Sequence, residues 1–309
     1  MLDSKSGVLS LIWDGRETLD TVLIIGCGDI GRRIAALYLK RGWPVDGVAR
    51  SADTLANMRA HGIQIHAADL DRPETLQGLP TAQAVIFYLA PPPSEGAEDA
   101  RMRGFLSFLP STGLPEKIVY ISTSGVYGDC QGAWVTEDAP TQPQHDRSRR
   151  RLSAELALLA FQEHTQVPVA ILRVGGIYGP DRLPLERIKR KEPVLRLAEC
   201  GYTNRIHADD LAAVCVAAAE YGHGIYNVSD GHPGTMSEYF FQIADLFGLP
   251  RPPEISLSEA RQRISATMLS YLEESRRLDN RKMLVELGVK LKFPTLEAGL
   301  ADCVKTGGT

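Results

Sequence analysis

The first part of the chain alternates short apolar runs with stretches of helical character. Six runs rich in Val and Ile have the length of β-strands, and apolar residues recur at helical spacing between them, most clearly over residues 31–41 and 152–163. This alternation is typical of repeated βα units, because a crossover helix joins consecutive parallel strands. We therefore predict an α/β fold with a doubly wound parallel sheet. The predicted strands are residues 21–25, 45–49, 63–67, 84–89, 117–122 and 167–174.

Beyond residue 180 the alternation becomes less regular. A polar segment rich in Arg and Lys precedes a predicted helix over 210–219, a strand over 224–228 and a helix over 236–247. These elements indicate a smaller, mixed C-terminal lobe. The predicted parts of the chain are an N-terminal arm (1–20), the sheet-forming domain (21–180) and the smaller, substrate-binding lobe (181–309).

The composition narrows the class of partner. The 309 residues are 44% hydrophobic and 23% charged, which suits a globular protein with a full core. A formal net charge of −4 disfavours nucleic-acid binding, because that function relies on an excess of cations. A small-molecule substrate is therefore expected. The five cysteines are widely spaced without a C-x-x-C pair, so the sequence predicts neither a disulfide framework nor a metal site.

The hydropathy pattern indicates where in the cell the protein is expected. No apolar stretch approaches the roughly 20 residues that a membrane-spanning helix needs. The apolar run near the start of the chain is short and interrupted, with acidic residues on both sides. We expect a soluble, cytoplasmic protein without a membrane partner.

Three glycines follow the first predicted strand and satisfy G-x-G-x-x-G immediately before a helix. In that context the first glycine permits a tight turn, the second leaves room for a pyrophosphate, and the third lets helix and strand pack closely. The alternative is an ordinary βα turn that contains three glycines by chance. We predict a Rossmann-type dinucleotide-binding domain over 21–180. The cofactor-binding residues predicted in the turn are Gly26, Gly28, Asp29, Ile30, Gly31 and Arg32.

The end of the second strand bears on the type of dinucleotide. An NAD site usually has a carboxylate there, which holds the ribose hydroxyls. In this chain Ala49 is followed by Arg50 and Ser51. A guanidinium at this place can pair with a 2′-phosphate, and Arg32 or Arg33 could supply a second charge. Alternatively, Arg50 is a solvated residue at a strand end. We predict NADP in preference to NAD, bound in part by Arg50 and Ser51.

The segment 117–128, KIVYISTSGVYG, resembles the fifth strand of the extended short-chain dehydrogenase/reductase family, which includes nucleotide-sugar epimerases and dehydratases. Further similar segments follow at 171–180, 205–211, 224–229 and 277–280, so the resemblance covers nearly the whole chain. It implies that an acidic residue contacts the adenine and that a short segment passes beneath the adenosine ribose. The positions that match these features are Asp69, Leu89, Ala90 and Pro91.

The resemblance also implies a hydroxyl that hydrogen-bonds the reacting oxygen of the substrate. The matching position is Thr123, between Ser122 and Ser124. A hydroxyl suits this task because it can donate to a carbonyl and accept from an alcohol at the same place. The alternative is that the three hydroxyls only satisfy backbone groups at the end of the strand.

The acid/base pair of the family, a Tyr followed four residues later by a Lys, is missing. Counted back from the helix with Glu155 as anchor, the two positions hold Arg147 and Arg151. An arginine stays protonated at working pH and cannot act as a general base. A further departure is Gly176, where epimerases typically carry Asn. The arginines either meet a phosphorylated or carboxylated substrate or form a solvated helix start.

Two histidines remain as candidates for proton transfer. His145 lies in a polar loop, where a solvated role is the alternative. His207 precedes Asp209 and Asp210, which we expect to cap the N-terminus of the following helix.

The leading functional hypothesis is an NAD(P)-dependent oxidoreductase or epimerase/dehydratase-like enzyme that acts on a small polar, sugar-type substrate. The alternative is a non-catalytic NADP-binding regulatory protein with a degenerate active site. The absent Tyr and Lys favour the alternative, whereas the retained Ser-Thr-Ser turn favours the enzyme. The family resemblance implies a helix-mediated homodimer as an ordinary assembly, although the sequence itself gives no oligomeric state.

Overall fold

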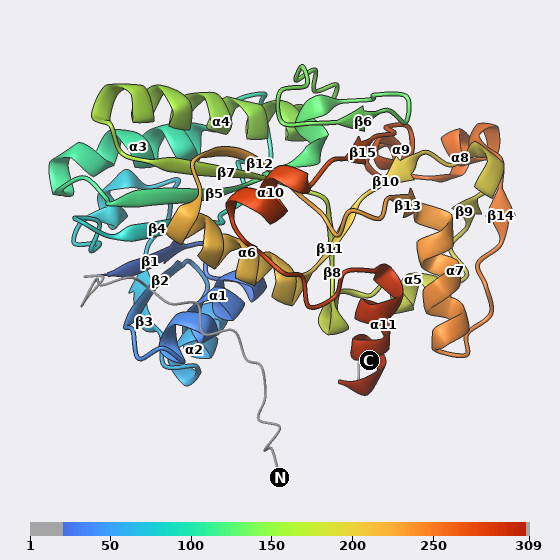
Figure 1. Cartoon of the computed structure of the whole chain (residues 1–309), viewed down its shortest axis with the longest axis horizontal. Helices are drawn as coiled ribbons and strands as arrows, with labels where there is room; N and C mark the ends of the chain where they lie inside the picture. Colours follow the sequence, from blue (N-terminus) through green and yellow to red (C-terminus); the bar gives the residue numbers. More distant parts are fainter. Residues whose placement is uncertain (1–20, 307–309) are drawn as a thin grey trace, which may run out of the picture.

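A seven-stranded sheet forms the centre of the protein, and all its strands run parallel to their neighbours (Figure 1). The computed structural model describes residues 21–306, except the side chains of residues 266 and 267, so the predicted N-terminal arm lies outside the described residues. Because the strand order reverses direction at β1, the sheet is doubly wound, and the predicted fold class is confirmed. Across the sheet the strands are β12 (Gly224–Val228), β7 (Val169–Val174), β5 (Lys117–Thr123), β4 (Val85–Tyr88), β1 (Val22–Ile25), β2 (Val45–Ala49) and β3 (Gln64–Ala67).

Helices cover both faces of this sheet. One face packs against α1 (Asp29–Leu39) and α6 (Ala208–Tyr221), and the other against α3 (Ala100–Thr112) and α4 (Asp146–Thr165). With both faces covered, a parallel strand is apolar along its whole length, which explains why all six residues of β7 are buried. The remaining helices of this part are α2 (Ala52–Ala60) and α10 (Arg281–Glu286).

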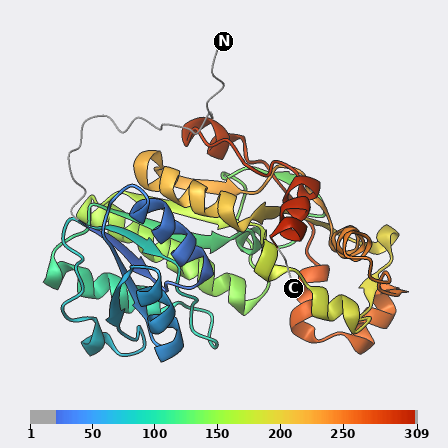
Figure 2. The same ribbon diagram turned by 90° about the horizontal axis from the view of Figure 1, so that it is seen from below.

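The smaller lobe lies beside the sheet in both views (Figures 1 and 2). Its longest helix, α7, begins with a capping box in which Thr235 and Glu238 satisfy each other's backbone N–H groups. The helices of the lobe are α5 (Leu185–Lys189), α7 (Met236–Leu246), α8 (Leu257–Arg263), α9 (Ala266–Leu272) and α11 (Leu296–Lys305). Short two-stranded sheets form outside the central sheet. They pair β6 (Trp134–Val135) with β15 (Arg277–Leu278), β8 (Gly176–Tyr178) with β11 (Arg205–His207), β9 (Val194–Leu195) with β14 (Glu254–Ile255), and β10 (Tyr202–Thr203) with β13 (Gly234–Thr235).

Two elements differ from the sequence-based expectation. Strand β12 and helix α6 follow residue 180, in the part of the chain assigned to the smaller lobe, yet β12 pairs with β7 and α6 packs on the central sheet. Helix α4 begins at Asp146, six residues before the predicted start, because its first turns are polar and carry no apolar periodicity. Within residues 21–306, no helix combines the length and apolar character needed to span a membrane.

Candidate functional site

The glycine turn between β1 and α1 has the geometry of an anion cradle. Gly26 adopts a φ of +85°, and a Cβ there would lie 2.7 Å from backbone atoms of Ala90, so the fold itself requires glycine. A Cβ on Gly31 would lie 3.0 Å from Ile24 Cγ2, so the third glycine allows close helix–strand packing. A Cβ on Gly28 would meet no atom within 4 Å. Gly28 is also the N-cap of α1 and supplies no capping side chain, which leaves the first amides of the helix available to an anion.

A cavity of about 300 Å³ opens next to this turn. The structure brings seven of the predicted cofactor-binding residues to its wall: Gly26, Gly28, Arg50, Ser51, Asp69, Ala90 and Pro91. Five others do not line it: Asp29, Ile30, Gly31, Arg32 and Leu89. Of these, Ile30 is buried against the core.

Arg50 and Arg101 are the cations of this cavity. The Arg50 side chain is 57% exposed, with Nη1 at 3.6 Å from Asp69 Oδ1 and 3.5 Å from Asp71 Oδ2. Arg101, on α3, donates to both oxygens of Asp71 at 2.7 and 2.6 Å, and these hydrogen bonds lower the pKa of Asp71. Asp71 is thus shared between Arg101 and Arg50, and a phosphate bound here would compete with Asp69 and Asp71 for the Arg50 guanidinium. No motif in the sequence indicates Arg101, because it reaches the cavity from α3 rather than from the glycine turn or a strand end.

Asp29 links the glycine turn to the substrate side of the molecule. Its carboxylate accepts hydrogen bonds from Arg33 Nε at 3.0 Å and from Arg182 Nε at 2.6 Å. Burial raises its pKa, but the hydrogen bonds and charges of the two arginines outweigh burial and hold the pKa of Asp29 below its ordinary value. Asp29 therefore stays ionised and contacts arginines rather than the cofactor cavity.

A second cavity, of about 470 Å³, lies at the carboxyl ends of β5 and β7, and Pro92 on its wall directly follows Pro91 of the first cavity. Thr123 and Ser124 line it, followed by Gly176 at the position where epimerases carry Asn. Its charge is strongly positive, because five arginines face a single carboxylate, Glu274. These arginines are Arg147, Arg151, Arg182, Arg205 and Arg276.

The three hydroxyls of the Ser-Thr-Ser turn have different surroundings. Thr123 Oγ1 accepts a hydrogen bond from Gly125 N at 3.2 Å and keeps its own proton for another acceptor. Ser122 points away from the cavity, is 3% exposed, and donates to Glu155 Oε1 at 2.5 Å. Glu155 in turn pairs with Arg173, so Ser122 belongs to a buried structural network. The structure therefore does not support the expected catalytic role of Ser122.

The arginines at the Tyr and Lys positions are both held by protein groups. The Arg147 guanidinium lies 3.8 Å from the ring centroid of Tyr271 and donates to Ser270 Oγ. Arg151 donates to Ile121 O at 3.0 Å. Among the described residues, no lysine lines this cavity, whereas Tyr202 and Tyr271 do. The family's Tyr and Lys couple thus has no counterpart in place.

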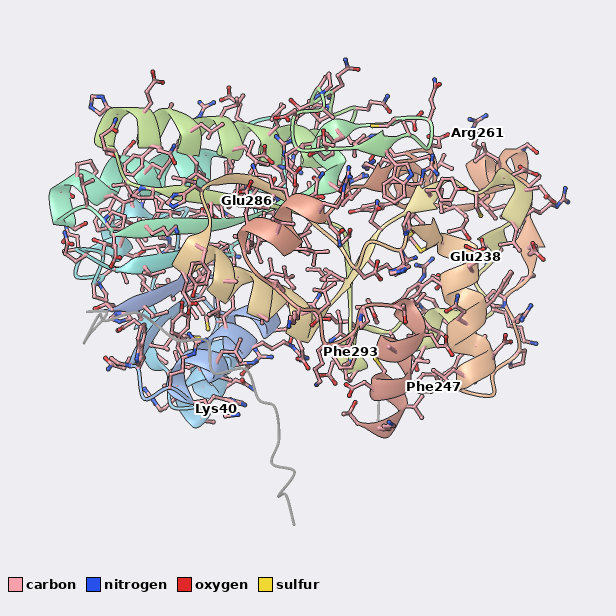
Figure 3. The ribbon with its side chains drawn as sticks, viewed as in Figure 1. Lys40, Glu238, Phe247, Arg261, Glu286 and Phe293 are labelled. Atoms are coloured by element: carbon pink, nitrogen blue, oxygen red, sulfur yellow. The ribbon has the colours of Figure 1, made fainter. Side chains whose placement is uncertain are left out.

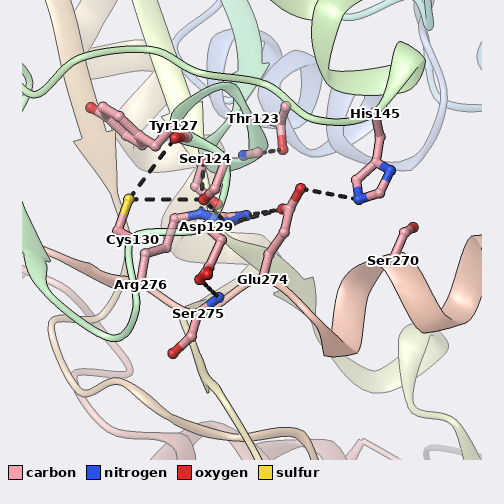
Figure 4. A network of polar contacts seen from close by, with 12 residues as sticks. Thr123, Ser124, Tyr127, Asp129, Cys130, His145, Ser270, Glu274, Ser275 and Arg276 are labelled. Atoms are coloured by element: carbon pink, nitrogen blue, oxygen red, sulfur yellow. Dashed lines mark hydrogen bonds and ion pairs between the residues drawn. The ribbon is translucent and has the colours of Figure 1, made fainter. Parts of the chain in front are cut away.

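His145 lies beside a buried carboxylate of the cavity wall (Figure 4). Its Nε2 is 3.4 Å from Oε1 of Glu274, an atom that has no hydrogen bond, and Oε2 of Glu274 accepts from Arg276. Arg276 also donates to the carbonyl oxygens of Ser124 and Gly128, which fixes the pair against the Ser-Thr-Ser turn. No local pattern in the sequence indicates Glu274, because it follows Ser124 by 150 positions.

His207 has a structural role in place of the expected one. It is fully buried, and its Nδ1 caps α6 by accepting from Asp209 N at 3.2 Å. Burial lowers its pKa, which favours the neutral ring. The expectation that Asp209 and Asp210 cap this helix was wrong, because Asp210 accepts the backbone N–H groups of Lys292 and Phe293 at 2.7 and 2.9 Å instead. Within residues 21–306, no group of His, Cys, Asp and Glu side chains is arranged to hold a metal ion.

Comparisons with known proteins agree with this geometry. Residues 22–229 match the model of the NAD dependent epimerase/dehydratase family. Protein YeeZ of Escherichia coli K12 is 28% identical over 287 residues, which cover 88% of this chain and 96% of that protein.

The fold is shared with several solved structures. A conserved protein of unknown function from Silicibacter pomeroyi has a TM-score of 0.79 at 28% identity, over 94% of this chain and 99% of that one. The UDP-glucose 4-epimerase of Thermotoga maritima, solved with UDP-glucose, has a TM-score of 0.75 at 20% identity, over 92% and 97%. The dTDP-glucose 4,6-dehydratase of Bacillus anthracis, solved with NAD, has a TM-score of 0.76 at 20% identity, over 92% and 95%. The chain belongs to the NAD dependent epimerase/dehydratase family, within the extended short-chain dehydrogenase/reductase fold.

Proposed function

We propose that this protein is an NAD(P)-dependent enzyme of the oxidoreductase or epimerase/dehydratase type, with NADP as the preferred cofactor and a sugar-type substrate that carries an anionic group. The observation that carries this proposal is the presence of two cavities: one lies at the glycine turn, and the other holds Thr123 among five arginines. Arginines bind phosphate and carboxylate groups in fixed geometry, and their number here exceeds what Glu274 can neutralise.

The residues at the first cavity fit a dinucleotide phosphate. The open N-terminus of α1 and the unobstructed Gly28 suit the pyrophosphate, and Arg50 suits a 2′-phosphate. A bound nicotinamide would supply the hydride chemistry. The chain's own residues then have to bind the substrate, orient its reacting oxygen and move a proton.

We assign these tasks to separate residues that line or adjoin the second cavity. Arg147 and Arg276 bind the anionic part of the substrate, and the Thr123 hydroxyl donates to the reacting oxygen. His145 with Glu274 is the pair assigned to proton transfer, because an imidazole can both give and accept a proton and its Nε2 lies 3.4 Å from the carboxylate of Glu274 on the cavity wall.

The test combines a spectroscopic assay for reduced nicotinamide with chromatography of the sugar products, because an epimerase or dehydratase returns the hydride to the sugar and leaves no net reduced cofactor. The protein is incubated with NADP or NAD and a panel of nucleotide sugars and sugar phosphates, beginning with UDP-glucose. We expect turnover of at least one member of the panel and a loss of about 100-fold in Thr123→Ala, the size typical of removing one such donor. Ser111→Ala, an exposed hydroxyl on α3, is the control and should keep full activity.

Two outcomes would contradict the assignment. If Thr123→Ala keeps full turnover and Tyr271→Phe loses it, the reacting centre lies in the smaller lobe rather than at Thr123. If no panel member is converted to a product and none changes the redox state of the cofactor although NADP binds, the non-catalytic regulatory function is favoured instead. The observation behind that second candidate is that Arg147 and Arg151 stand where the family has Tyr and Lys.

A further inference from the structure

A third cavity lies in the smaller lobe, between α7 and the start of α11, which are neighbours in Figure 1. Its volume is about 810 Å³, and Figure 3 marks its α7 side by Glu238. It shares a single wall residue, Arg205, with the arginine-rich cavity described above, and it contains no residue of the glycine turn. The proposed enzyme activity therefore does not explain this cavity.

Arg205 is a buried cation without a carboxylate partner. The residue is 7% exposed, and its guanidinium donates to Thr203 Oγ1 at 2.8 Å and packs 4.1 Å from the ring centroid of Tyr239. Among the described residues, no carboxylate oxygen lies within 4.0 Å of it. Burial accordingly lowers the pKa of Arg205, although the residue remains charged. An unpaired buried charge is costly, and a bound anion would remove that cost.

Asp230 is the complementary group on the same wall. It is 5% exposed, and Oδ1 accepts from His232 N at 2.9 Å, whereas Oδ2 is buried without a hydrogen-bond partner. Burial raises the pKa of Asp230 to about 6. Its backbone N–H donates to Arg205 O at 2.7 Å, which fixes the two residues relative to each other. The side chains nevertheless form no ion pair, so each can receive a ligand group of opposite charge.

The rest of the lining adds negative charge and apolar surface. Asp245 is paired with Arg251, and Glu238 is engaged in the cap of α7, but Glu297 is exposed and forms no ion pair with any residue in the part of the chain that the structure describes. Leu246, Leu296 and Leu300 provide apolar contacts beside these carboxylates. A ligand with an aliphatic stem and a second positive charge would satisfy both features.

We propose that this cavity binds a basic amino acid, with the ligand carboxylate on Arg205, its α-ammonium on Asp230, and its side-chain cation near Glu297. This inference goes beyond the proposed function, because it concerns a separate cavity and needs no turnover.

Calorimetry on the full chain tests the proposal with L-lysine and two analogues that each lack one group. Cadaverine lacks the carboxylate, and 6-aminohexanoate lacks the α-ammonium. We expect L-lysine to bind about tenfold more tightly than either analogue, the factor of one charge-assisted hydrogen bond, and L-glutamate to bind more weakly still. Asp230→Asn should lower the affinity for L-lysine by about tenfold. Glu186→Gln, which alters an exposed carboxylate on α5, should leave that affinity unchanged.

Binding of NADP to Asp230→Asn is measured alongside and should equal that of the parent, which shows that the variant is folded and separates this proposal from the enzymatic one. The proposal is overturned if L-lysine gives no binding, if cadaverine binds as well as L-lysine, or if Asp230→Asn leaves L-lysine affinity unchanged.

Discussion

Among single residues, Arg50 is the one that we propose to select NADP over NAD. Its competitors for a 2′-phosphate are Asp69 and Asp71, at 3.6 and 3.5 Å, and Asp71 is already hydrogen-bonded to Arg101. We expect the parent to bind NADP more tightly than NAD by at least about 1 kcal/mol, and Arg50→Ala to lose most of that difference. Calorimetry with both cofactors measures this difference in binding free energy. Arg59→Ala, which removes an exposed arginine on α2, is the control. A parent that prefers NAD, or a variant that keeps the preference for NADP, would exclude Arg50 as the selecting residue.

Asp230 should make the stability of the protein depend on pH. Burial raises its pKa from the ordinary 3.8 to about 6, so the folded state binds a proton more tightly than the unfolded state does. As pH rises from 4 to 6, ionisation of this group therefore destabilises the fold, by up to about 3 kcal/mol at neutral pH for a shift of two units.

Asp230→Asn removes this cost while keeping an acceptor for His232 N. The variant should be more stable than the parent in urea denaturation at pH 7, and the difference should vanish below pH 4. A variant that is less stable than the parent by the same amount at both pH values would show that the ionisation of Asp230 carries no such cost.

At the scale of elements, Asp210 holds the segment before α11 against the start of α6. It is 2% exposed and accepts two backbone N–H groups, from Lys292 and Phe293. We expect Asp210→Ala to lower the free energy of unfolding by about 3 kcal/mol, because a buried and a partly buried backbone donor lose their acceptor. The neighbouring Asp209 pairs with Arg33 at a half-exposed site, so Asp209→Ala should cost under about 1 kcal/mol. Equal losses of unfolding free energy in the two variants would contradict the larger stabilising role assigned to Asp210.

The elements that the sequence predicted well are those with a local signal. The apolar runs placed all six of the predicted central strands, and the glycine spacing placed the turn before α1, because both patterns depend on neighbouring residues. The place of β12 at the sheet edge depends on pairing with β7, about fifty residues earlier, which no local pattern records. The same holds for Arg101 and Glu274, which reach their cavities from distant segments.

The different surroundings of Ser122 and Thr123 could have been predicted from their positions in a strand. Successive side chains of a strand point to opposite faces, so Ser122 and Thr123 at the end of β5 could not both face the substrate. The structure places Thr123 at the cavity and Ser122 on the buried Glu155. The opposite error concerns His207, where proximity to Asp209 and Asp210 suggested capping by carboxylates although the imidazole itself is the cap.

For the whole molecule, the distribution of charge matters more than its sum. The chain has a formal net charge of −4, yet the second cavity, at the carboxyl ends of β5 and β7, gathers five arginines around one carboxylate. Such local concentration of one sign attracts an anionic ligand even to an acidic protein. Arg182 belongs to this cavity and also pairs with Asp29 in the first turn of α1, so an ion pair connects the second cavity with the glycine turn.

The account depends most on dinucleotide binding at that turn, and Gly28→Val tests it directly. The fold has room for a side chain at Gly28, since a Cβ there meets nothing within 4 Å, so the substitution should block the pyrophosphate without unfolding the protein. Gly104, on α3, is equally open, and Gly104→Val serves as the matched control. In calorimetric titrations with NADP, we predict binding to the parent and to Gly104→Val, and loss of binding in a folded Gly28→Val. Unchanged NADP affinity in Gly28→Val would contradict the account.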